Sequence, residues 1–155
     1  MKRHRFSLIL AVGIVAAIVA IFAGSLASYA PKRRAITLGE GKGLPFSDGV
    51  LVGNTLYVAG QEGTDDAGKL KSGGIGPETQ AALDNIKRVV EQAGFQMSDI
   101  VSVNVYLADI HEFGDMNAVY KSVMPDPKPA RATIQAAALV NSARVEIAAI
   151  AVKEK

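Results

Sequence analysis

The chain has 155 residues, 49% of them apolar, with 17 basic and 15 acidic side chains and no cysteine. Its length fits one globular domain, and the lack of cysteine excludes disulfides, thiolate metal ligands and a cysteine nucleophile. Three of the bases precede residue 31, so the rest of the chain sets 14 bases against all 15 acids. Such a near-neutral body lacks the clustered basic face that binds a nucleic-acid backbone, and we expect no nucleic-acid partner.

The N-terminus joins a basic start to an apolar run. No charged side chain occurs between Arg5 and Lys32, and a helix of roughly 20 apolar residues spans a bilayer core of about 30 Å. Residues 1–30 are therefore predicted to be either a signal peptide cut after Ala27 or a single-pass anchor formed by residues 6–26. We expect the body to lie outside the cytoplasm, as a periplasmic or secreted protein or one anchored to the inner membrane.

The first half of the body reads as a linker, two strands and a helix. Residues 31–43 are predicted to be a linker with a short edge strand near residues 35–38. Residues 49–60 contain two apolar runs around a Gly-Asn pair, which is typical of a tight hairpin. After a polar loop, apolar residues recur every three or four positions from Pro77 to Gly94, which predicts an amphipathic helix covering a sheet.

The second half continues with a strand, a helix and two further strands. Alternating valines predict a strand over residues 101–107, and a second helix is expected from Ile110 to Val123. Three prolines then precede two strands near residues 130–138 and 144–152. This order indicates an α+β fold with two helices on one face of a sheet. The other face is predicted to be apolar and to mediate association, because it would carry Ile134, Ala136, Ala138 and Ile150.

Few residues have the character of a catalytic or metal site. The two histidines, His4 and His111, have no histidine or cysteine partner nearby, so no metal site is predicted. The glycine-rich run from Gly73 to Gly76 precedes a predicted helix. It could bind an anion at the N-terminus of that helix or simply form a loop, and the sequence leaves both interpretations open.

Arg131 and Glu146 stand out because each is a charged residue inside an otherwise apolar strand. A buried charge is costly unless it is paired or binds a ligand. If the last two strands form a hairpin, the two groups lie roughly 16 Å apart in one chain. A direct ion pair within the chain is then excluded, and the groups are either separately solvated or meet across a subunit boundary.

Five segments together resemble the RidA family, also called YjgF or RutC. They are LYVAGQEG (56–63), TQAALDNIKRVVEQAG (79–94), DIVSVNVYLADIHEFGDMNAVYKSV (99–123), PARATIQ (129–135) and RVEIAAIAV (144–152). The resemblance spans residues 36–152 and implies a chorismate-mutase-like α+β fold in a homotrimer with sites between subunits. It also implies hydrolytic deamination of 2-imino or enamine acids, such as 2-aminoacrylate or 2-iminopropanoate, to 2-oxo acids and ammonia. No metal or organic cofactor is implied.

The resemblance assigns roles to six positions. Arg131 matches the arginine that binds the substrate carboxylate, and Glu146 matches the glutamate that activates water. The remaining matches line the pocket, namely Phe46, Gly60, Asn117 and Thr133. Phe46 stands where relatives often carry a tyrosine, and Val140 where a proline is common. The alternative function is a non-catalytic module that binds or senses small carboxylates on the same trimer, and a third is RNA cleavage or chaperone activity.

Overall fold

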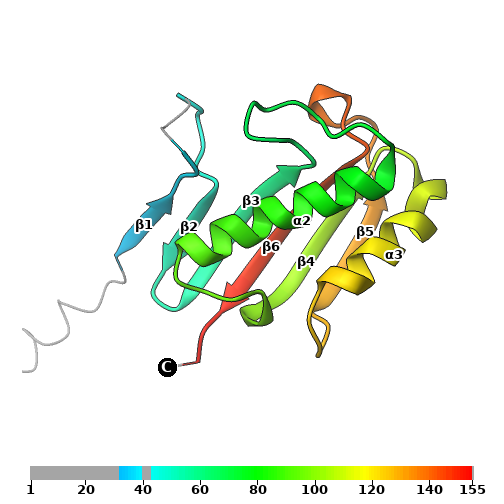
Figure 1. The fold of residues 1–155 in the computed structure, drawn as a ribbon. Helices are drawn as coiled ribbons and strands as arrows, with labels where there is room; N and C mark the ends of the chain where they lie inside the picture. The colour runs from blue at the N-terminus through cyan, green and yellow to red at the C-terminus, as the bar shows by residue number, and fades with distance from the viewer. Residues whose placement is uncertain (1–31, 40–42, 155) are drawn as a thin grey trace, which may run out of the picture. The chain divides into compact units, whose positions relative to one another are not determined.

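A computed structural model describes residues 32–39 and 43–154 (Figure 1). The chain divides into two units, residues 1–32 and 33–155, and the fold described below belongs to the second. The predicted signal peptide or anchor lies outside the described residues. Among the residues that are described, no helix is long and apolar enough to cross a membrane.

The second unit is built on one mixed sheet with two α-helices. Its six strands follow the order β1-β2-β3-β6-β4-β5, so β1 and β5 are the edges (Figure 1). The strands are β1 (Arg33–Ile36), β2 (Gly49–Val52), β3 (Thr55–Glu62), β4 (Ile100–Leu107), β5 (Ala130–Gln135) and β6 (Val145–Val152). The helices are α2 (Ile75–Gln92) and α3 (Phe113–Val123), with short 3-10 turns η1 (Met97–Asp99), η2 (Ile110–Glu112) and η3 (Val140–Ser142).

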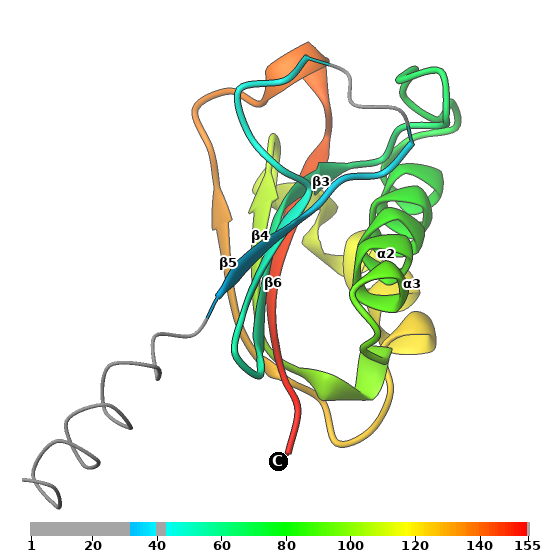
Figure 2. The same ribbon diagram turned by 90° about the vertical axis from the view of Figure 1, so that its left-hand side faces the viewer.

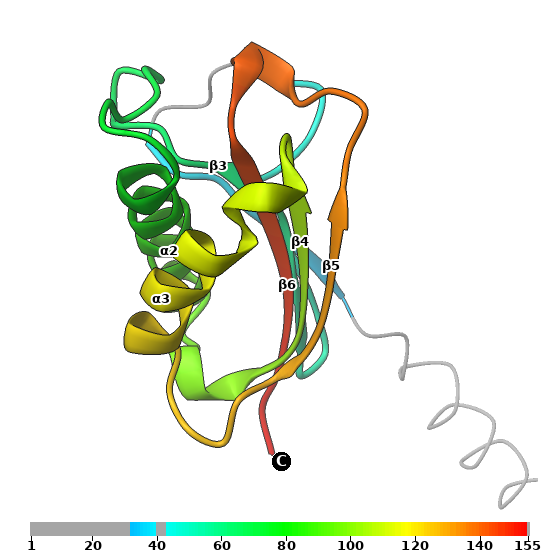
Figure 3. The ribbon, with the colours of Figure 1, turned by 90° about the vertical axis from the view of Figure 1, so that its right-hand side faces the viewer.

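Both helices cover the same face of the sheet (Figures 2 and 3). The apolar positions of α2 pack on β3 and β6, and α2 also contacts α3. Between the helices and the sheet lies one core, and each fully buried leucine or isoleucine in it contributes roughly 1.5–3 kcal/mol. Its largest fully buried side chains include Leu56, Leu83, Ile86, Leu107, Met116 and Ile147. This layered arrangement confirms the predicted α+β fold.

The predicted strands and helices occur with shifted ends. The edge strand covers residues 33–36 rather than 35–38, and the first helix begins at Ile75, two residues before Pro77. Gly53 makes the predicted hairpin turn between β2 and β3 with a φ of 61°. The second helix begins as a 3-10 turn at Ile110 and becomes α-helical only at Phe113.

The predicted hairpin between the last two strands is wrong. β4 lies between β5 and β6, pairing parallel with β5 and antiparallel with β6. The reason is that α3 carries the chain back from the end of β4, so β5 runs in the same direction as β4. β6 then enters the sheet between β3 and β4.

The face of the sheet opposite the helices is partly apolar and open. Tyr57 is 49% exposed and Ile134 is 54% exposed, and Ile150 pairs with Tyr57 on the same face. Two of the four residues predicted for this face, Ala136 and Ala138, lie in the connection after β5, because the strand ends at Gln135. In the single chain, aliphatic and aromatic side chains are therefore open to solvent across several strands.

Candidate functional site

Arg131 and Thr133 face α3 from the edge strand β5. They pair in register with Val103 and Val105 of β4, which are buried beneath the helices. Side chains at paired positions share one face of a sheet, so both residues point to the helical side. Each is half-buried, and the Thr133 hydroxyl is buried with no hydrogen-bond partner among the described residues.

The guanidinium of Arg131 rests against two rings of α3. Its Cζ lies 4.4 Å from the centre of the Tyr120 ring and 5.7 Å from that of Phe113. Asn117 falls between these rings in the spacing i, i+4, i+7, which places all three on one side of the helix. The structure therefore gathers Arg131, Thr133 and Asn117 on one side of the chain, and we call these three residues the arginine half.

Glu146 points to the opposite face of the sheet. Its neighbours Val145 and Ile147 are fully buried under the helices, so strand alternation turns the half-buried Glu146 toward the open face. The register of β3 against β6 shifts between Val58 and Gln61, which forms a bulge at Ala59 and Gly60. A Cβ at Gly60 would lie 2.6 Å from Cδ of Glu146. A side chain at position 60 would therefore displace this carboxylate from the place it occupies.

Glu62 is a neighbour of Glu146 that the sequence analysis missed. The two glutamates are paired in register across β3 and β6, and Asn141 donates its side-chain N–H to Glu62 Oε2 at 2.9 Å. Burial raises the pKa of the Glu146 carboxyl above its usual value, and the nearby Glu62 carboxylate raises it further. Only the register of β3 against β6 brings Glu62 beside Glu146, so no local pattern in the sequence identified it. Glu146, Gly60 and Glu62 form what we call the glutamate half.

The two halves do not meet within one chain. Arg131 lies level with Ala149, and Glu146 lies level with Ile134, with β4 between them. Arg131 and Glu146 are therefore offset by three residues, or about 10 Å, along the strand direction. The hairpin expected from the sequence would have separated them by roughly 16 Å. More decisively, the side chains lie on opposite faces, and no ion pair joins them within the described residues.

Phe46 lies in a loop that is bonded to the bulge of β3, where the backbone N–H of Ala59 donates to the carbonyl of Asp48 at 2.9 Å. It is 58% exposed and precedes β2. The loop is tied to the chain after β1 by the backbone N–H of Leu38, which donates to Asp48 Oδ2 at 2.7 Å.

Most of the described chain matches the model of a known protein family. The family model described as endoribonuclease L-PSP matches residues 42–153. The chain belongs to the endoribonuclease L-PSP family. This is the RidA (YjgF/RutC) family that the sequence resembles, so the predicted membership is confirmed.

Members of the L-PSP family in distant organisms are similar over most of their length. A human protein named 2-iminobutanoate/2-iminopropanoate deaminase is 40% identical over 124 residues, covering 78% of this chain and 90% of the relative. RidA from the Antarctic bacterium Psychrobacter sp. PAMC 21119 has a TM-score of 0.73 at 34% identity, covering 77% and 99%. TdcF of E. coli, described with bound serine, has a TM-score of 0.72 at 27% identity, covering 78% and 99%.

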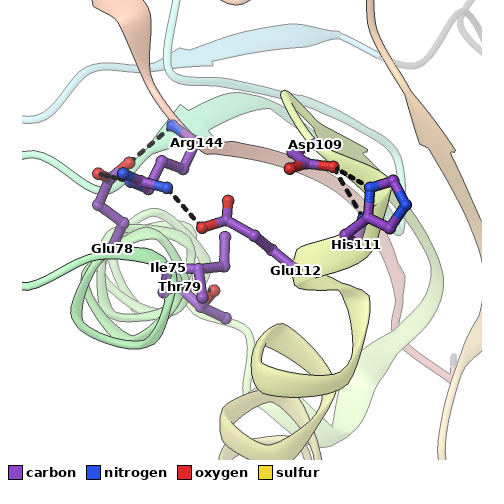
Figure 4. A network of polar contacts seen from close by, with 7 residues as sticks. All are labelled: Ile75, Glu78, Thr79, Asp109, His111, Glu112 and Arg144. Carbon is purple, nitrogen blue, oxygen red and sulfur yellow. Dashed lines mark hydrogen bonds and ion pairs between the residues drawn. The ribbon is translucent and has the colours of Figure 1, made fainter.

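His111 of this L-PSP family member is held at the start of η2. Its ring and its backbone N–H both contact Asp109 Oδ1, at 2.8 and 2.9 Å, and the ring is largely exposed (Figure 4). The backbone N–H of His111, followed by its ring, lowers the pKa of Asp109. Among the described residues, no group of three or more His, Cys, Asp or Glu side chains is arranged to hold a metal ion.

Arg144 joins three elements at one end of the fold (Figure 4). Its backbone N–H donates to Glu78 Oε2 of α2 at 2.8 Å, and its Nη1 donates to Glu112 Oε1 of η2 at 2.5 Å. Glu78 is 5% exposed, whereas Arg144 is about half exposed. We interpret this cluster as structural, because its acidic groups are held by Arg144 itself. The sequence analysis did not predict it.

Proposed function

We propose that this L-PSP family member hydrolyses reactive 2-imino and enamine acids to 2-oxo acids and ammonia. Relatives that match most of the chain are named 2-iminobutanoate/2-iminopropanoate deaminase. The observation that carries the proposal is the Glu146 carboxylate, which is seated against the bare backbone of Gly60 and has a raised pKa. Such a carboxylate is suited to accept a proton from water.

Arg131 is assigned to substrate binding. No carboxylate of the described chain pairs with it, so its N–H groups are free to hold the carboxylate of a 2-imino acid through two charge-assisted hydrogen bonds. Asn117 and Thr133 line the same pocket, and Phe46 supplies an aromatic wall without the hydroxyl of a tyrosine.

Glu146 is assigned to the proton transfers. Water attacks the imine carbon, forming a C–O bond while Glu146 takes a proton from the water. Glu146 then returns that proton to the nitrogen, which gives a carbinolamine. The hydroxyl proton of the carbinolamine next passes through Glu146 to the nitrogen, the C–N bond breaks as the C=O bond forms, and ammonia leaves the 2-oxo acid. These steps need no electron acceptor, and we assign no cofactor to them.

A complete site is proposed to form between subunits of a homotrimer. The arginine and glutamate halves lie on opposite faces of the sheet, so one chain cannot offer both to one small substrate. The open face carries Tyr57 and Ile134, and burying it against another copy would bring in a second chain. Closed rotational symmetry with three copies then gives three equivalent sites.

The test is ammonia release from enzymatically generated 2-iminopropanoate. The full chain is expected to accelerate it, and Arg131→Ala is expected to lower kcat/KM on the order of a hundredfold, since a charged bidentate contact is lost. Arg88→Ala is the matched control, because within residues 32–39 and 43–154 Arg88 pairs only with the exposed Asp66. An Arg131→Ala variant as active as the control would refute the assignment.

A second candidate function is binding or sensing of small carboxylates without turnover. It is favoured by the relative from E. coli that is described with bound serine, and by the absence of a hydroxyl at Phe46. This function predicts saturable binding of 2-oxo acids with no ammonia release, and Glu146→Gln would leave that affinity largely intact. We do not propose RNA as a substrate, because the body is near neutral.

We further propose that residues 1–30 direct the protein to or across the membrane. The support is the uncharged stretch between Arg5 and Lys32. Membrane fractionation with protease protection of a C-terminal tag would separate the two forms: an anchored protein stays in the membrane, and a cleaved one becomes soluble outside the cytoplasm. A full-length product in the cytoplasm would contradict both.

A further inference from the structure

The guanidinium of Arg131 is held differently from that of other arginines. The guanidinium of Arg144 forms ion pairs with the carboxylates of Glu78 and Glu112, and that of Arg88 donates to Asp66. Arg131 instead lies over the rings of Tyr120 and Phe113, at 4.4 and 5.7 Å from their centres. An aromatic ring attracts the charge of a guanidinium without accepting a conventional hydrogen bond from its N–H groups. The rings therefore hold Arg131 without occupying the donors that a ligand needs.

The two rings differ in how firmly they are held. Tyr120 is 5% exposed and belongs to the core, whereas Phe113 is 39% exposed at the start of α3. The Tyr120 hydroxyl is buried without a hydrogen-bond partner among the described residues. Burial raises the pKa of this hydroxyl, although the Arg131 charge opposes the shift. The ring of Tyr120 is thus held in place by burial, and its hydroxyl forms no hydrogen bond with the described residues.

We propose that Tyr120 and Phe113 are positioning residues that fix the guanidinium of Arg131 in the orientation that receives a 2-imino acid carboxylate. This inference rests on the proposed function, because it assigns the two rings to the same substrate-binding arginine. An arginine on an edge strand otherwise samples many rotamers, and ordering it on binding weakens affinity. The rings supply this order before the ligand arrives.

The experiment measures steady-state kinetics and direct binding in the full chain. Phe113→Leu and Tyr120→Leu remove one ring each. Each is expected to raise KM for the imino acid on the order of tenfold, as expected for loss of a cation–π contact, with kcat within about twofold. Calorimetry with 2-oxobutanoate is expected to show a matching rise in Kd. A merely structural defect would lower kcat or the melting temperature without this selective rise in KM.

Two further variants serve as controls. Tyr120→Phe restores the ring and is expected to recover most of the affinity lost in Tyr120→Leu. Phe95→Leu removes a ring that is as buried as that of Tyr120 and whose centre lies 5.1 Å from Lys153 Nζ. This variant is expected to leave KM and Kd unchanged. If Tyr120→Leu fails to fold, Phe113→Leu decides, because its side chain is partly exposed.

The outcomes separate the inference from the proposed function. Unchanged KM and Kd in Phe113→Leu, or equal losses in Tyr120→Phe and Tyr120→Leu, would overturn the positioning role while the deaminase function stands. Ring-dependent binding of 2-oxobutanoate without turnover would support the positioning role and refute the deaminase function. An unaltered protein with neither binding nor turnover would overturn both.

Discussion

The carboxylate of Glu146 occupies the space that a side chain at position 60 would fill. Gly60 lies on the bulge of β3, where the backbone approaches β6 without a Cβ. Gly60→Ala is expected to push the carboxylate aside and lower kcat on the order of a hundredfold or more, since small displacements of catalytic groups are costly. Ammonia release from 2-iminopropanoate measures the loss.

Gly76→Ala is the matched control for this substitution. Gly76 lies within α2, and a Cβ there would meet only the Val119 side chain at 3.9 Å. Alanine in a helix is favoured over glycine by roughly 0.5–1 kcal/mol, so this variant should keep its activity and gain slightly in thermal stability. Full activity in Gly60→Ala would show that the carboxylate position does not matter.

Glu146 also predicts a pH dependence of stability. Its folded pKa is raised above the unfolded value, so its contribution to stability is fully present below the unfolded pKa of about 4.3. That contribution is lost as the pH rises through the folded pKa. Glu146→Gln removes the charge and is expected to raise the melting temperature at pH 7, with a gain that shrinks toward pH 4.

Thermal unfolding between pH 4 and pH 8 measures this effect. Glu154→Gln, at an exposed position near the C-terminus, should show no comparable gain. A melting temperature of Glu146→Gln that stays below that of the unaltered protein at pH 7 would contradict the raised pKa.

At single residues, the sequence was informative where a charge broke an apolar pattern. Arg131 and Glu146 could be picked out in this way. Glu62 could not, because only the register of β3 against β6 pairs it with Glu146. The contact of Asn141 with Glu62 depends on a left-handed backbone at Asn141, with φ of 55°. Local patterns do not encode either feature.

Among the elements, Arg144 links the start of α2, the end of η2 and the start of β6 (Figure 4). Arg144→Ala would leave the buried Glu78 carboxylate without its counter-charge and Glu112 without its donor. The expected cost is about 1–3 kcal/mol in the free energy of unfolding. Urea denaturation measures it. Arg88→Ala, which breaks an exposed pair, should cost at most about 1 kcal/mol; equal costs would show that burial of Glu78 is unimportant.

The elements themselves could largely be predicted, but their order in the sheet could not. Apolar spacing of three and four gave α2, and alternation gave β4. A hairpin between β5 and β6 was expected because consecutive strands commonly pair. It does not form, because α3 returns the chain so that β5 pairs with β4 instead. The same helix supplies Tyr120 and Phe113 to Arg131, a contact that depends on this crossover.

For the whole molecule, a site shared between subunits predicts complementation. Arg131→Ala and Glu146→Gln should each be inactive alone. If the two variants are unfolded and refolded together in equal amounts, about a quarter of the sites in random trimers combine two intact halves. Ammonia release should recover to about that share of the unaltered activity. No recovery would mean that both groups act from one chain.

The assembly could be anticipated only in part. An apolar open face was predicted from strand alternation, and Tyr57 and Ile134 lie there. The opposite orientation of Arg131 and Glu146 was not predicted, because it depends on the register through β4, which sets Arg131 level with Ala149, three residues from Glu146.

The crossover from α3 to β5 has a further consequence. The arginine half and its two rings all lie in one continuous stretch, residues 113–133, whereas the glutamate half draws on β3 and β6 from distant parts of the chain. Apart from Phe46, the residues assigned to ligand binding are thus contiguous in the chain. We expect that transplanting this stretch between relatives would alter ligand preference and leave the water-activating carboxylate in place, so that the two properties could diverge independently.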